Sequence, residues 1–136
     1  MDAKQQRILD AASDFWISSE ILWSQSGQQI FPLRSTIVTT AFAIELYLKF
    51  LSSIYGVDAW GHGLLSLFQK LPKQLKVEIR LNYKGKGTVE EALEEYKNLF
   101  VDWRYIFQKQ DSCFSLDIQS LVALRDCVRI VSETYR

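Results

Sequence analysis

Residues 37–56 read IVTTAFAIELYLKFLSSIYG and form the longest apolar-dominated run in the chain. Apolar side chains recur there every three or four positions, which is the spacing of a helix stripe, and a second apolar row runs beside the first. A helix that is apolar on more than one side is usually buried among other helices. The sequence therefore predicts a central core helix that stops near Gly56. Glu45 and Lys49 interrupt this helix one turn apart, where they either pair, reach its edge or build a site.

Helices are also predicted on both sides of the central one. The same periodicity places them at about residues 2–23, 89–107 and 116–134, with a short helix from Leu64 to Leu71. Residues 75–83 alternate as a strand does, but no partner strand is apparent, so we favour a helix there. Thr88 and Glu91 match a capping box. Because short connections make sequential helices antiparallel, we expect an all-α fold, an up-and-down bundle of four to five helices in a single domain, residues 1–136.

The composition narrows the classes of function. The 136 residues carry 16 basic and 16 acidic side chains, and this balance argues against a general polyanion binder. Cys113 and Cys127 fit a reducing compartment and match no zinc spacing. The first residues lack the apolar core of a signal peptide, and charges within the central run cost about 2.5–3.5 kcal/mol each in a membrane. We therefore expect a cytoplasmic protein with no membrane contact, no DNA-binding motif, no cofactor and no metal site.

The candidate site combines charged residues with the only histidine of the chain. Glu45 and Lys49 lie on the central helix, His62 lies in the linker that follows, and Arg104 flanks the apolar stripe of the predicted helix 89–107. From there Arg104 can reach Glu45, and its guanidinium offers paired donors to a carboxylate or a phosphate. The structural interpretation is an ion pair that fixes helix register, with His62 capping the short helix. The functional interpretation is a pocket for a nucleotide or RNA phosphate.

Two further sets of residues are open to two interpretations. The basic tract binds phosphate or is simply the solvated face of a helix, and it comprises Lys73, Lys76, Arg80, Lys84 and Lys86. The tryptophans form a stacking surface or supply core and dimer contacts, and they are Trp16, Trp23, Trp60 and Trp103. For both sets the structural interpretation is favoured.

Three strings, AIELYLKFLSSIYG, GHGLLSLFQKLP and FVDWRYIF, resemble the HEPN superfamily of helical domains over about residues 41–107. The residues that carry the resemblance are Glu45 and Lys49 in the second helix, His62 with Leu64 and Leu67 in the next segment, and Arg104 with Tyr105 in a later helix. The resemblance implies a compact helical bundle, often dimeric, in prokaryotic stress, toxin–antitoxin or phage-defence systems. Many members are metal-independent ribonucleases in which an Arg precedes a His by four to six residues. Here no arginine stands at that distance before His62, and no histidine follows Arg104.

The resemblance and the residues lead to one main hypothesis. We expect a non-catalytic HEPN-like module, homodimeric in the manner of that family, that binds a nucleotide, an RNA or a protein partner. In this hypothesis Arg104 and Lys49 contact an anionic group, Glu45 orients Arg104, Tyr105 adjoins it, and His62 lines the mouth of the pocket. The alternatives are a homodimeric structural or interaction protein and an atypical ribonuclease that uses His62. Replacing Arg104 with alanine should abolish binding in the main hypothesis and unfold the protein in the structural interpretation.

Overall fold

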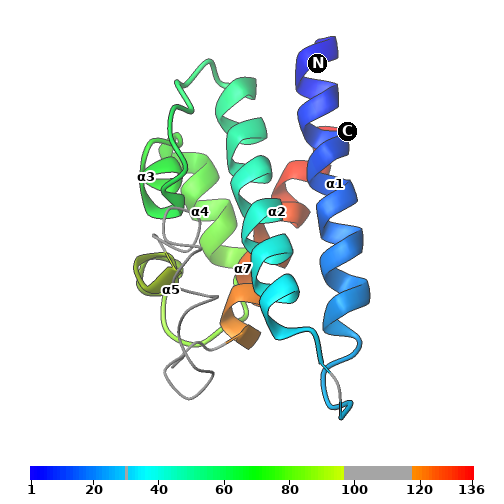
Figure 1. Cartoon of the computed structure of the whole chain (residues 1–136). Coiled ribbons are helices and arrows are strands. Elements are labelled where there is room, and N and C mark those ends of the chain that lie inside the picture. The colour runs from blue at the N-terminus through cyan, green and yellow to red at the C-terminus, as the bar shows by residue number, and fades with distance from the viewer. Residues whose placement is uncertain (30, 97–117) are drawn as a thin grey trace.

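The computed structural model describes residues 1–29, 31–96 and 118–136. This part of the chain contains helices and no strand, which confirms the predicted all-α fold. The helices are α1 (Ala3–Trp23), α2 (Leu33–Ile54), α3 (Leu64–Gln69), α4 (Lys73–Asn82), α5 (Val89–Tyr96) and α7 (Ile118–Glu133) (Figure 1). The helix chosen for residues 75–83 is confirmed as α4. The predicted helix 89–107 is described only as far as Tyr96.

Helix α2 is the central core helix that the sequence predicts. Twelve of its 22 residues are buried, and it packs against α1, α3 and α7. Figure 1 shows α1 and α2 running antiparallel side by side, with α7 crossing behind them. Within the described ranges α2 alone is long and apolar enough to cross a membrane. Its apolar side chains instead form the centre of the hydrophobic core, together with residues of every other described helix.

One glutamine, Gln5, joins the start of α1 to the end of α2. The backbone N–H of Gln5 donates to the carboxylate of Asp2 at 2.8 Å, and the N–H of Asp2 donates to the amide oxygen of Gln5 at 2.9 Å. This reciprocal pair is a capping box that starts α1. The amide nitrogen of Gln5 also donates to the carbonyl oxygen of Ser53 at 3.0 Å. The first turn of α1 is therefore held against the last turn of α2.

The start of α5 shows one of the two hydrogen bonds of the predicted capping box, the one to the Thr88 hydroxyl. The backbone N–H of Glu91 donates to the Thr88 hydroxyl at 3.1 Å. Glu90 and Glu91 lie in the first turn of α5, where carboxylates interact favourably with the helix dipole. Glu90 also pairs with Arg80 of α4, so an ion pair joins α4 to the start of α5.

Arg125 lies buried between α7 and α1, which the sequence did not predict. Its side chain is 1% exposed. The guanidinium donates to the Ser19 hydroxyl at 3.0 Å, pairs with the carboxylate of Glu20, and donates to Asp126 at 2.8 Å. The indole of Trp16 donates to the same Asp126 oxygen at 3.1 Å, and the ring lies 5.5 Å from the guanidinium of Arg125. A single arginine therefore joins the two helices by hydrogen bonds, charge and ring contact.

Cys127 is a core residue on the apolar side of α7. It is fully buried, and its thiol lies 3.1 Å from the carbonyl oxygen of Leu124. Burial raises the pKa of this thiol to about 12, so almost no thiolate is present at neutral pH.

Cys127 is therefore expected to resist thiol reagents in the native state. In a Cys113→Ser variant, where Cys127 is the remaining cysteine, a chromogenic disulfide reagent should react slowly in buffer and rapidly in denaturant. The two rates can be measured by absorbance. Rapid reaction of the folded variant would contradict the buried environment of this thiol.

Candidate functional site

Glu45 is a buried carboxylate at the edge of α2 with two basic neighbours. Its side chain is 3% exposed. Nδ1 of His62 lies 2.9 Å from one carboxylate oxygen, and Nζ of Lys49 lies 3.7 Å from the other. The contact with Lys49 follows from helix geometry, because residues four apart lie on one face. The contact with His62 joins α2 to the linker of residues 57–63, so Glu45 and His62 together are termed the linker clasp.

The clasp corrects one structural expectation for His62. Helix α3 begins after Gly63, and no side chain caps its first turn, so the expectation that His62 caps this helix is wrong. The imidazole is instead bonded to Glu45 and remains 64% exposed. Gly61, directly before it, has a φ of +97°, a conformation that strains residues with a side chain. This glycine lets the chain turn between Trp60 and His62.

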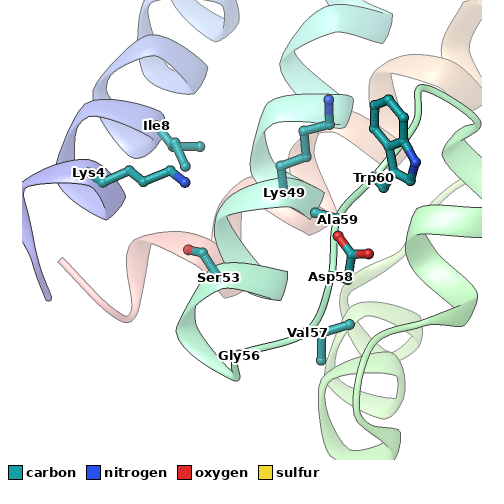
Figure 2. Close-up of a pocket in the computed structure, with 9 residues that line it drawn as sticks. All are labelled: Lys4, Ile8, Lys49, Ser53, Gly56, Val57, Asp58, Ala59 and Trp60. Carbon is teal, nitrogen blue, oxygen red and sulfur yellow. The ribbon is translucent and has the colours of Figure 1, made fainter.

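An open groove lies beside the clasp, where the start of α1, the end of α2 and the linker meet. Its volume is about 650 Å³, which is within the usual range for small-molecule sites. Figure 2 shows Lys4 extending from α1 toward α2, Lys49 and Ser53 on α2, and Asp58 and Trp60 on the linker. The remaining lining residues are Ile8, Gly56, Val57 and Ala59.

The groove presents polar groups that the described residues leave without a bonding partner. Lys4, Asp58 and the indole of Trp60 form no hydrogen bond or ion pair with any part of the chain that the structure describes. Lys49 is only loosely engaged, since its ammonium lies 3.7 Å from Glu45. Trp60 is 81% exposed, so of the two structural roles expected for the tryptophans, core contact or dimer contact, it does not have the first. Two cations, one carboxylate and an exposed aromatic ring are thus available to a ligand.

Three of the five predicted site residues lie in the part of the chain that the structure describes. The structure brings Glu45, Lys49 and His62 together, and Lys49 also lines the groove. Glu45 and His62 are not among the residues that line the groove. Arg104 and Tyr105 lie outside the described residues, and their roles stay predictions.

Lys4, Asp58 and Trp60 were not among the candidate site residues. The sequence holds one signal for the last two, a glycine-containing linker with a tryptophan two residues before the only histidine. No signal marks Lys4, because only the packing of α1 on α2 brings it to the groove.

The basic tract of α4 and the following loop divides into structural and exposed parts. Arg80 pairs with Glu90 and lies 5.6 Å from the ring of Phe68, so it stabilises the junction with α5. Lys76 donates to the carbonyl oxygen of Gln69 at 3.3 Å. Lys84 and Lys86 line a smaller hollow of about 190 Å³ beside the start of α7. These contacts favour the structural interpretation for Arg80 and Lys76.

Comparison with known proteins does not indicate a function for this chain. No protein-family model matches this chain, and no curated protein or solved structure matches it. The function is therefore inferred from what the lining side chains can bind. Ammonium groups attract phosphate oxygens, and an exposed indole offers a face on which a nucleobase can stack.

Proposed function

We propose that this protein is a non-catalytic, HEPN-like helical module that binds a nucleotide or the phosphate-bearing end of an RNA in the groove. One observation carries the proposal: Lys4 and Lys49 share an open groove with the exposed ring of Trp60. The HEPN likeness and the binding activity are both part of the proposal. The groove supports it because its volume suits a ligand of nucleotide size.

The two lysines are the phosphate contacts in this proposal. They come from different helices, α1 and α2, and the bond from Gln5 to Ser53 holds those helix ends together. Each lysine acts as a point charge, so binding should weaken as salt rises. The balanced overall charge of the chain fits a local anion site better than a general affinity for polyanions.

Trp60 supplies the second part of the site. Stacking of a base on an aromatic side chain contributes about 1–3 kcal/mol. The linker clasp anchors the loop two residues after Trp60, so the ring is carried by a tethered segment. Phosphate contacts on the helices and a stacking ring on the linker define a ligand with an anionic end and a flat end.

Titration with 5′-nucleoside monophosphates at low salt tests this function. The parent protein should bind, with a rise in its unfolding midpoint, since a ligand of the native state stabilises it by mass action. Lys49→Gln and Trp60→Ala should each weaken binding by about tenfold. Lys70→Gln is the matched control, because Lys70 lies at the end of α3 and does not line the groove. Equal affinities in all variants, or no binding of any nucleotide, would contradict the proposal.

The alternative is a homodimeric interaction protein, and one observation favours it. Ile17 and Ile21 lie one turn apart on α1 and are 50% and 61% exposed. If this face joins two copies, Ile21→Lys should convert a dimer to a monomer in sedimentation equilibrium. A parent protein that is monomeric at all concentrations would exclude the alternative.

The atypical ribonuclease is tested by incubating the parent protein and His62→Ala with RNA. This function requires that the parent cleaves the RNA and that His62→Ala does not.

A further inference from the structure

We propose that the groove selects guanine, and that Asp58 is the residue that reads the base. This inference rests on the proposed function, since it names the ligand class of the same groove. Asp58 and Trp60 are two residues apart on the linker, and both line the groove (Figure 2). A base stacked on Trp60 therefore has a carboxylate near its edge.

The carboxylate of Asp58 is free to accept hydrogen bonds. It is exposed, and it has no partner in the described part of the chain. The Asp58 side chain comes from the linker, whereas the lysines come from α1 and α2. A nucleotide can thus bind with its phosphate beside the lysines of α1 and α2 and its base beside Asp58 and Trp60 of the linker. The opposite orientation would set the phosphate beside Asp58, where like charges repel.

Guanine matches an ionised carboxylate better than the other bases do. A carboxylate accepts hydrogen bonds and donates none, and its two oxygens suit a pair of parallel donors. Guanine offers such a pair, its N1–H and its exocyclic amino group. Adenine and cytosine offer one amino group beside an acceptor nitrogen, and uracil offers one N–H between two carbonyl oxygens. Each of these edges turns at least one acceptor toward the carboxylate.

A titration series that changes only the base edge tests the inference. The probes are GMP, IMP, XMP and AMP at one salt concentration, with the parent protein and Asp58→Asn. The parent should bind GMP about tenfold more tightly than AMP, with IMP between them because it lacks the amino group. Asp58→Asn should weaken GMP about tenfold and leave AMP within about twofold. It should also favour XMP over GMP, because the asparagine amide can donate to the carbonyl oxygen that replaces the amino group.

The outcomes separate this inference from the proposed function. If GMP and AMP bind the parent equally and both depend on Lys49, the groove is a nucleotide site without guanine selection. If Asp58→Asn weakens every nucleotide alike, Asp58 acts on the structure of the linker and the inference is overturned. If no nucleotide binds, the proposed function itself falls. Unfolding midpoints without ligand, measured on both proteins, show that the variant is folded.

Discussion

Replacing Arg125 with alanine is expected to lower the free energy of unfolding by about 3–5 kcal/mol. The guanidinium is 1% exposed and bridges α7 to α1 through Ser19 and Glu20. The variant would lose these hydrogen bonds and the contact with Trp16, and it would leave the Ser19 hydroxyl buried without this donor. Urea unfolding of parent and variant, followed by circular dichroism, measures the change.

Two control variants separate burial from charge. Arg129 also lies over the ring of Trp16, at 3.8 Å, but it is only partly buried. Arg129→Ala should therefore cost less than about 1 kcal/mol. Arg125→Met should recover part of the loss, because Glu20 and Asp126 are half exposed and can return to water. Equal small losses for Arg125→Ala and Arg129→Ala would contradict the central place of Arg125 between the helices.

Replacing His62 with alanine is expected to lower the free energy of unfolding by about 1–3 kcal/mol. The substitution removes the histidine that is hydrogen-bonded to a buried carboxylate, and among the described residues it leaves Lys49, at 3.7 Å, as the basic side chain beside that carboxylate. The linker loses its bond to α2 at the same time. The fluorescence anisotropy of Trp60 should then fall as the linker becomes more mobile, measured as the difference from the same protein with Trp60→Phe.

A double-mutant cycle shows whether this loss belongs to the linker clasp. Glu45→Ala removes the buried carboxylate, so adding His62→Ala to it should cost much less than His62→Ala costs alone. Additive losses would mean that the two residues act independently. Lys70→Ala, at an exposed position outside the clasp, should leave both the unfolding free energy and the anisotropy of Trp60 unchanged.

The fold was predictable because its strongest signals are local. The apolar rows of α2 repeat with the helix period, and the hydroxyl of Thr88 caps α5 as the pattern indicates. The choice of a helix for α4 succeeded because a lone strand would have left its backbone groups unpaired. Arg125 was missed for the opposite reason. A charged residue in an amphipathic helix is usually exposed, and only the partners on α1 make its burial favourable.

The site was predictable only where helix geometry dictates it. Glu45 and Lys49 must be neighbours, since they are four residues apart in one helix. The contact of His62 with Glu45 depends on the backbone path of the linker. The sequence identifies the two residues, but it does not determine that path. Lys4 reaches the groove only because α1 packs on α2, a contact between residues far apart in the chain.

The measurement that tests the central claim most directly is the indole N–H spectrum of the ¹⁵N-labelled protein during titration with GMP. The signal of Trp60, assigned by its loss in Trp60→Phe, should shift in proportion to ligand binding. The signals of Trp16, which is bonded to Asp126, and of Trp23, which packs on Phe31, should stay in place. Lys49→Gln should reduce the shift of Trp60 at the same GMP concentration. A Trp60 signal that stays unmoved at saturating GMP would contradict the assignment of the groove as a nucleotide site.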